Sequence, residues 1–138
     1  EQLKIKSDVG KVNFTVTDKV DKIDMGSNVG DVTLTLDAQV KDLTLSSDVG
    51  NVTLEGDAAI EQIKASSDVG NVTLKLLTPG DGFDLRSNVG NVSLTIEDAP
   101  SDFAINTNKK DVNSDFDTTK DSSCPYVIKT DVGNITVR

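Results

Sequence analysis

One nine-residue phrase, SSDVGNVTL, occurs at residues 46–54 and recurs unchanged at 66–74. Related phrases start every 20 residues from position 7 to position 107, and a last one starts at position 130. The copies are SDVGKVNF (7–14), SNVGDVTL (27–34), SDVGNVTL (47–54 and 67–74), SNVGNVSL (87–94), the degraded TNKKDVNS (107–114) and TDVGNITV (130–137). A fixed period of this length predicts a repeat architecture, in which stacked units share one elongated core.

Within one copy, apolar and polar residues alternate, and this alternation predicts β-strands. In the first copy, Leu3 and Ile5 occupy odd positions, whereas Val12, Phe14 and Val16 occupy even positions. The phase changes at the corner Asp-Val-Gly-Lys, where the glycine supplies the positive φ that a tight turn needs. Each copy is therefore expected to contain a strand, a tight turn, a second strand and a looser bend.

The corner residues are given a structural role. Asp and Asn favour turns because their side chains cap nearby backbone N–H groups, and the alternation of Asn with Asp reduces like-charge repulsion. The row of acids could instead bind Ca²⁺, but the calcium-binding β-roll pattern is absent, so we favour the turn interpretation and predict no cofactor. The predicted turn residues are Asp8, Gly10, Asn28, Gly30, Asp48, Gly50, Asp68, Gly70, Asn88, Gly90, Asp131 and Gly133.

A 20-residue unit with two short strands cannot bury its own apolar face, but stacked units can, because each strand pairs in parallel with its equivalents in the neighbouring copies. We therefore predict an all-β fold, a single-stranded parallel β-helix (β-solenoid) of about seven coils. It forms one domain over residues 1–138, with its last two coils irregular over 107–129. Three apolar columns support it: Leu3, Ile23, Leu43, Ile63, Phe83, Phe103 and Tyr126; Ile5, Met25, Leu45, Ala65, Leu85, Ile105 and Ile128; and Val12, Val32, Val52, Val72, Val92, Val112 and Ile135.

Two further columns share the parity of Leu3 and Ile5 and are expected to point inward. One is the corner valine, as at Val9, and Lys109 would replace it in the sixth copy. The other is a hydroxyl ladder, in which each hydroxyl needs a hydrogen-bond partner in the next coil or in the turn backbone. We interpret it as structural, because a serine nucleophile needs a base and the chain has no histidine. The ladder comprises Ser7, Ser27, Ser47, Ser67, Ser87, Thr107 and Thr130.

The sixth copy is the place where a partner-binding feature is most easily imagined. Lys110 replaces the turn glycine, and three residues are inserted before the last copy. Functional residues concentrate on loops that a rigid scaffold carries. The candidate partner-binding residues are Lys109, Lys110, Asp115, Phe116 and Lys120. The alternative, a decayed coil near one end that has no partner, is the one we favour.

The formal net charge of −9 excludes the basic surface that nucleic acid requires, and it disfavours direct contact with anionic lipid. A membrane association is expected only through a tether outside this chain, because no segment is apolar enough to span a bilayer. The chain starts and ends within repeats, so we expect it to be part of a longer protein. The single cysteine excludes an internal disulfide framework. Open terminal coils could associate end to end through unpaired strand edges.

The phrase S-D/N-V-G-N-V-T-L at 20-residue intervals resembles the bacterial adhesin-type β-strand-repeat family, also called toastrack domains, over residues 3–138. The resemblance implies a right-handed β-helix in an extracytoplasmic protein of the bacterial cell envelope or surface. It implies a non-enzymatic module that binds a protein, a peptide or a cell-surface glycan, or that serves as a scaffold.

Two alternatives to that module stay open. One is an envelope-stress sensor domain that binds a membrane partner or a cationic peptide. The other, a carbohydrate-active β-helix enzyme, is disfavoured because the chain has only two arginines, Arg86 and Arg138, and shows no sign of a groove in its sequence.

Overall fold

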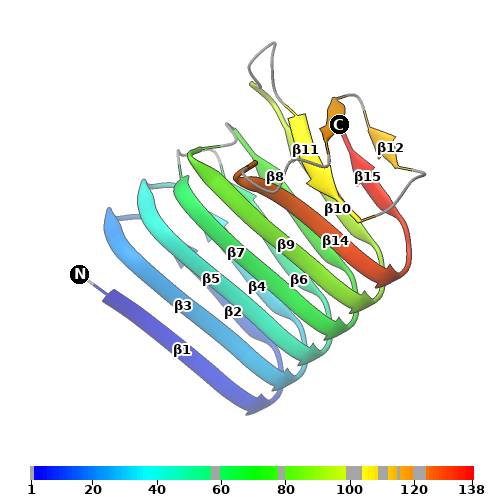
Figure 1. Ribbon diagram of the computed structural model, residues 1–138. Coiled ribbons are helices and arrows are strands. Elements are labelled where there is room, and N and C mark those ends of the chain that lie inside the picture. The colour runs from blue at the N-terminus through cyan, green and yellow to red at the C-terminus, as the bar shows by residue number, and fades with distance from the viewer. Residues whose placement is uncertain are drawn as a thin grey trace.

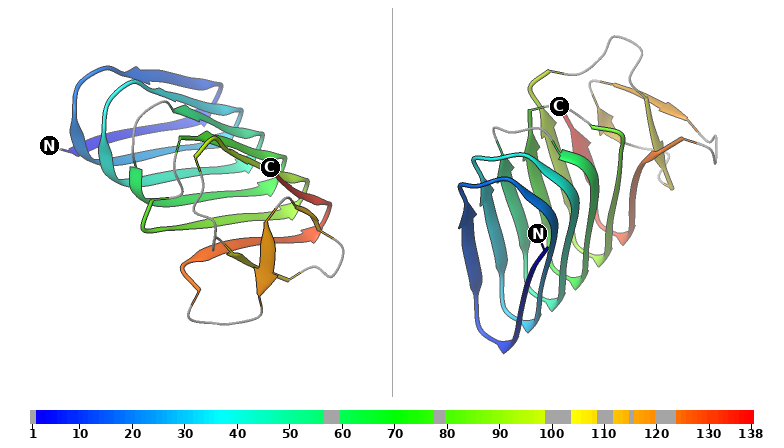
Figure 2. Two further views of the ribbon diagram at one scale, coloured as in Figure 1. Left: turned by 90° about the horizontal axis from the view of Figure 1, so that it is seen from above. Right: turned by 90° about the vertical axis from the view of Figure 1, so that its left-hand side faces the viewer.

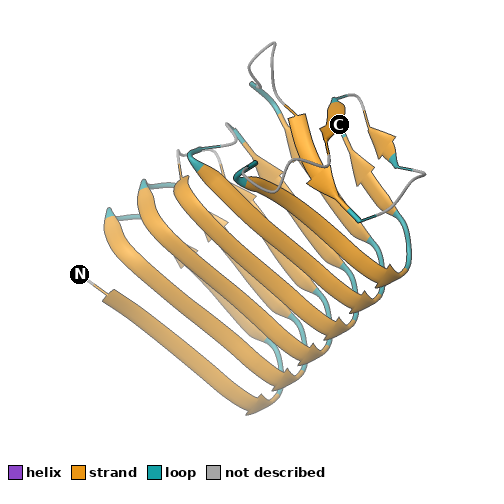
Figure 3. Cartoon of the chain, viewed as in Figure 1, coloured by secondary structure: helices purple, strands orange, loops and turns teal. Residues whose placement is uncertain are grey.

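The regular elements that the structure describes are all β-strands, as the alternation predicts (Figure 3). The computed structural model describes residues 2–56, 60–77, 80–98, 104–108, 112–114, 116–119 and 124–138. Within these ranges, the strands form two parallel sheets that face each other, and the chain runs back and forth between them (Figures 1 and 2).

The first sheet holds the longer strands. Its spatial order is β1 (Gln2–Val9), β3 (Val20–Val29), β5 (Val40–Val49), β7 (Ile60–Val69), β9 (Gly82–Val89), β14 (Tyr126–Val132), β11 (Ala104–Thr107) and β13 (Asp117–Thr119). The second sheet holds shorter strands, in the order β2 (Val12–Val16), β4 (Val32–Leu36), β6 (Val52–Gly56), β8 (Val72–Leu76), β10 (Val92–Ile96), β15 (Ile135–Val137) and β12 (Asn113–Ser114).

The strand registers place equivalent residues of neighbouring coils side by side. Leu3 pairs with Ile23, and Val32 pairs with Val52, so the 20-residue period of the sequence is also the length of one coil. The inward side chains of both sheets form one continuous core between them. The predicted all-β parallel β-solenoid is therefore confirmed.

The corner glycines adopt the positive φ that the sequence requires, as Gly70 does at 146°. They also stack on one another: a Cβ atom added to Gly70 would overlap the carbonyl group of Gly50 in the preceding coil. At Gly10, in the first coil, the nearest atom to such a Cβ would be Ser7 Oγ, at 3.9 Å. The glycine is therefore needed for its backbone conformation in every coil, and for the close approach only where another coil lies beneath it.

The order of the last coils corrects the prediction that copies stack in sequence order. Strand β14 of the seventh copy pairs with β9 of the fifth, and β11 of the sixth copy lies beyond β14. In the second sheet, β15 lies between β10 and β12 in the same way. The chain therefore runs out to the end of the solenoid and returns to insert its last coil between the fifth and sixth copies (Figure 1).

The corner motif gives the physical reason for this insertion. The last copy keeps D-V-G-N, so it reproduces every corner contact with the fifth copy: Gly90 N donates to Val132 O at 2.8 Å, and Thr130 Oγ1 donates to Gly90 O at 2.9 Å. The sixth copy has Lys110 in place of the glycine and would lose the close approach of the corners. As the outermost coil, the sixth copy has no further coil on its outer side and therefore does not need the close approach of corners there.

The corner valines correct a second expectation, because they point outward. Val29, Val49, Val69 and Val89 are 48–49% exposed, and Val9 is 78% exposed. Each corner valine is the last residue of its strand, and the bend follows at the glycine, so the valine is exposed although it shares the parity of the buried hydroxyl position. Lys109 therefore stands where the other copies carry a surface residue, although Lys109 itself lies outside the described residues.

Candidate functional site

The buried hydroxyl ladder is confirmed, and each hydroxyl has a structural partner. Ser27 donates to Gly10 O at 3.1 Å, Ser67 donates to Gly50 O at 2.8 Å, and the equivalent bonds recur along the corner. Among the described residues, no buried side-chain nitrogen or oxygen lacks a partner. These hydroxyls tie each coil to the corner of the coil before it.

A second ladder, which was not predicted from the sequence, follows the corner glycines. Asp31 Oδ1 accepts a hydrogen bond from Asn51 N, and Asn51 Oδ1 accepts one from Asn71 N, both at 2.9 Å. The same bond joins Asn71 to Asn91, and Asn91 to Asn134 of the inserted coil. The recurring Asn after the glycine is the feature of the sequence from which this ladder could have been predicted. These residues cap the backbone N–H groups, a role that we had assigned to the residue two positions before the glycine.

The column of Asp8 and its equivalents lies on the surface, where its side chains contact each other. Asn28 Nδ2 lies 3.5 Å from Asp8 Oδ1, and Asn88 Nδ2 donates to Asp68 Oδ1 at 3.2 Å. These contacts agree with the expected relief of charge repulsion by interleaved Asn. In the described part of the chain, no group of three or more His, Cys, Asp or Glu side chains is arranged to hold a metal ion.

Of the predicted partner-binding residues, Lys109, Lys110, Asp115 and Lys120 lie outside the described residues. Phe116 is half-buried and packs against the end of the core. Its backbone N–H and C=O are both bonded to the hydroxyl of Ser114, at 3.0 and 2.9 Å. Phe116 therefore helps to close this end of the solenoid.

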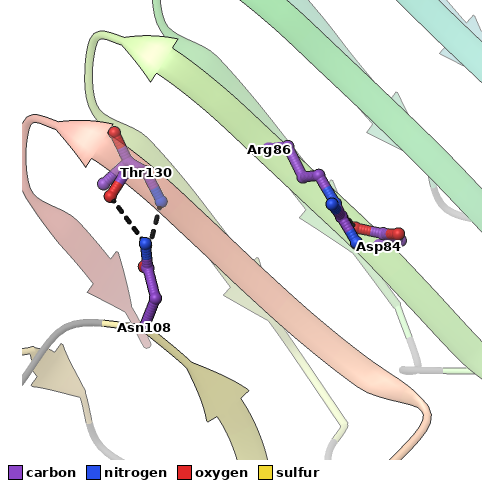
Figure 4. Close-up of polar contacts among 4 residues, drawn as sticks. All are labelled: Asp84, Arg86, Asn108 and Thr130. Atoms are coloured by element: carbon purple, nitrogen blue, oxygen red, sulfur yellow. Dashed lines mark hydrogen bonds and ion pairs between the residues drawn. The ribbon is translucent and has the colours of Figure 1, made fainter.

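Asn108 joins the sixth copy to the inserted coil where the sixth copy leaves the repeat pattern (Figure 4). Its Nδ2 donates to Thr130 O at 3.0 Å, and its Oδ1 accepts from Thr130 N at 3.2 Å. The side-chain amide thus replaces a strand neighbour for Thr130, because an amide offers the same donor and acceptor as a peptide group.

The candidate functional site is a groove of about 440 Å³ on the outer face of the first sheet. Cys124 and Pro125, which lead into the inserted coil, form part of its wall. They reach the sheet at Gly82, where a Cβ atom would lie 3.2 Å from Pro125. The remaining lining comes from β3, β5, β7, β9 and β14, with its charged or polar side chains at Lys22, Asp42, Thr44, Gln62, Lys64 and Asp84.

The groove offers charges of both signs to a ligand. Lys22, Asp42 and Lys64 are exposed, and they form no ion pair or hydrogen bond with the other described residues. Asp84 instead accepts a hydrogen bond from Arg86 Nε at 2.7 Å, and this bond and the charge of Asp84 raise the pKa of Arg86 (Figure 4). This groove could not be predicted from the sequence, because its lining residues differ from copy to copy and its wall depends on the inserted coil.

No protein-family model matches this chain, and the curated proteins and solved structures likewise contain no significant match. The family resemblance of the repeated phrase therefore stays a prediction. The described residues include no helix with the length and apolar character that crossing a membrane requires.

Proposed function

We propose that this chain is a non-catalytic binding module of the bacterial cell envelope, located outside the cytoplasm, and that its groove binds an extended peptide segment of a partner protein. The observation that carries this proposal is the unpaired set of Lys22, Asp42 and Lys64 in the groove. The buried hydroxyls and the asparagine ladder are used by the scaffold, whereas these side chains are available.

The arrangement of the charges favours a peptide with charges of both signs. Lys22 and Asp42 are paired positions of adjacent strands, and Thr44 and Lys64 are paired positions one column along. Adjacent strands lie about 4.8 Å apart, so a chain lying across them meets a new side chain at each strand. A segment whose charge alternates at every second residue, as in Lys-x-Glu-x, directs charges of both signs to one face, because successive side chains of an extended chain point to opposite faces.

The test is a titration of the 138-residue chain, followed by backbone NMR, with three extended peptides: one of Lys-Ser-Glu-Ser repeats, whose charges alternate along one face, one of Lys and one of Glu. We expect the alternating peptide to shift amide signals of β3, β5, β7 and β9. The Lys22→Glu and Lys64→Glu variants should weaken this binding about tenfold each, and Lys129→Glu on the same sheet should not, because Lys129 lies outside the groove.

A preference for the all-Lys peptide, with shifts along the Asp8 corner and a steep dependence on salt, would instead support the sensor alternative. That result agrees with the net charge of −9 and would contradict the groove proposal.

A further inference from the structure

The corner valines form an apolar ridge along one edge of the solenoid, where the corners of successive coils line up (Figures 1 and 2). Val29 pairs with Val49, and Val49 pairs with Val69. The row continues through Val89 to Val132 of the inserted coil. These valines are between 48% and 63% exposed, and none of them belongs to the core. Because adjacent strands lie about 4.8 Å apart, the row is a continuous apolar surface, which marks an interaction site.

The scaffold uses the other corner positions and leaves the valine side chains uncommitted. Gly50 allows the close approach, Ser67 donates to its carbonyl group, and Asn51 caps the next coil. The valine contributes its backbone: Gly50 N donates to Val69 O at 2.8 Å. Threonine, which is equally β-branched, would keep this bond, so the strand itself does not require a valine.

Two polar columns flank the ridge, and their charges are matched within each corner. The residue before the valine lies on the side of the first sheet, and the residue after the glycine lies on the side of the second sheet. No corner that contains the glycine has an acid in both columns. In coil order, the pairs are Asp8 and Lys11, Asn28 and Asp31, Asp48 and Asn51, Asp68 and Asn71, Asn88 and Asn91, and Asp131 and Asn134.

A second copy of the chain complements the ridge in one orientation. A twofold axis along the solenoid sets the first column of one copy against the second column of the other, so Asp48 faces Asn51 and Asn28 faces Asp31. A twofold axis across the middle of the ridge sets the first column against itself, and Asp48 then faces Asp68, which is repulsive. We propose that two copies of this chain associate side by side, parallel and in register, through their valine ridges. The contact involves neither end of the solenoid and is separate from the groove.

The size and charge of the ridge predict a weak pair that salt strengthens. The row from Val9 to Val132 is about 24 Å long, and a four-residue corner is about 13 Å wide. With its side chains, the contact covers roughly 400 Å² on each copy, less than in a standard stable interface, so we expect a dissociation constant on the order of 100 µM. Each copy has a net charge of −9, so screening should tighten the pair.

Sedimentation of the chain from about 20 µM to about 1 mM tests the proposal, and the dimer should be tighter at about 0.5 M salt than at about 0.05 M. Val69→Lys should weaken the dimer at least about tenfold, because the axis opposes the two introduced ammonium groups. Val69→Thr, the milder variant, should weaken it about threefold. The control Thr95→Lys makes the same charge change on the outer face of β10 and should leave the dimer unchanged. A chain that stays monomeric at about 1 mM in high salt, or a dimer that salt weakens, would overturn the proposal.

Disulfide formation tests the orientation. In a Cys124→Ser background, Val29→Cys places two thiols opposite each other across the parallel axis, whereas the antiparallel pair sets position 29 opposite position 89. We expect the Val29→Cys chain to oxidise to a covalent dimer faster than a Thr95→Cys chain. Equal rates, or a preference for the mixed pair of Val29→Cys with Val89→Cys, would overturn the parallel arrangement.

A charge exchange tests the facing of the columns. Asn51→Asp should weaken the dimer about tenfold, because it sets an acid opposite Asp48 twice. The new carboxylate can still accept the bond from Asn71 N, as Asp31 accepts one from Asn51 N, so the ladder is kept. Adding Asp48→Asn recreates the arrangement of Asn28 and Asp31 and should restore the dimer. Failure of this second exchange to restore it would overturn the proposed contact.

Discussion

The fifth and sixth copies of the repeat follow each other in sequence, yet the seventh copy lies between them in space. The fifth and seventh copies both carry the D/N-V-G-N corner, whereas the sixth has Asn108, followed by two lysines. The comparison shows that the quality of the corner motif, and not the order of the chain, decides which copies are neighbours. The corner of a coil inside the stack contacts a neighbouring corner on each side, whereas the corner of a terminal coil has a neighbour on one side only.

The connecting segment makes this rearrangement possible. The three residues inserted before the last copy lengthen the path that leads from β13 back to β14. The return also brings Cys124 and Pro125 onto the first sheet, where they form a wall of the groove. One local loss of the repeat therefore produces both the closed end of the solenoid and the most promising binding site.

The largest expected effect concerns a corner glycine inside the stack. Gly70→Ala should lower the free energy of unfolding by about 3 kcal/mol or more, because it adds a clash with the Gly50 carbonyl to the strain of a positive φ. The matched variant Gly10→Ala makes only an ordinary van der Waals contact with Ser7 Oγ and should cost about 1–2 kcal/mol. Urea unfolding compares the two, and equal losses would contradict the role of the close approach.

The next effect separates fully buried from half-buried members of the hydroxyl ladder. Ser67→Ala should cost about 1–3 kcal/mol, because Ser67 is only 2% exposed and its hydroxyl donates a hydrogen bond to Gly50 O of the preceding coil. Ser7 bonds to Val9 O in its own coil and is only half-buried, so Ser7→Ala should change stability by less than about 0.5 kcal/mol. Thermal unfolding of both variants measures the difference; a larger loss at Ser7 would run against this account.

A smaller effect is expected where the sixth copy meets the inserted coil. Asn108→Ala removes both bonds to Thr130 and should cost about 1 kcal/mol. Hydrogen exchange of the Thr130 amide should speed up, while the amides of β3 and β5 keep their protection. Asn13→Ala, on the exposed face of β2, serves as the control and should change neither quantity. Unchanged exchange at Thr130 would show that Asn108 does not hold this junction.

The smallest effect concerns the surface ion pair beside the groove. Arg86→Ala should cost about 0.5 kcal/mol, because the pair with Asp84 is well aligned but half exposed. Arginine is charged throughout pH 5 to pH 9, and the raised pKa of Arg86 moves the loss of its stabilisation to still higher pH, since that stabilisation is lost only when the pH rises through the folded-state pKa. Lys75→Ala, which breaks a 3.7 Å contact with Glu97, should be close to neutral. A cost for Arg86→Ala that varies across this pH range would contradict the assignment.

Much of the fold is predictable from the sequence because one period determines many contacts at once. The alternation around Ile5 and Phe14, the glycine at position 10 and the inward hydroxyl at position 27 each recur in register. The exposure of Val29 was not predictable from alternation, because Val29 has the parity of the buried positions but is the last residue of its strand, next to the corner.

The insertion and the groove depend on competition between copies. The loss of the glycine in the sixth copy is visible in the sequence. That the seventh copy, and not the sixth, pairs with the fifth copy is not visible there. Gly82 appears in the sequence as a small residue in a varied column, and its contact with Pro125 becomes visible only when the last coil is in place. Likewise, Lys22 and Lys64 are 42 residues apart and belong to no common sequence motif. They line the same groove only because their strands lie in the same sheet.

The inserted last coil is the central claim, and a disulfide cross-link tests it most directly. In a Cys124→Ser background, cysteines at Ser93 and Thr136 occupy paired positions of β10 and β15, whereas Ser93 and Asn113 are separated by β15. Adjacent strands lie about 4.8 Å apart, within disulfide reach, and alternate strands lie about 9.6 Å apart, beyond it. We predict rapid oxidation of the 93/136 pair and none of the 93/113 pair; the reverse result would show stacking in sequence order and contradict the account.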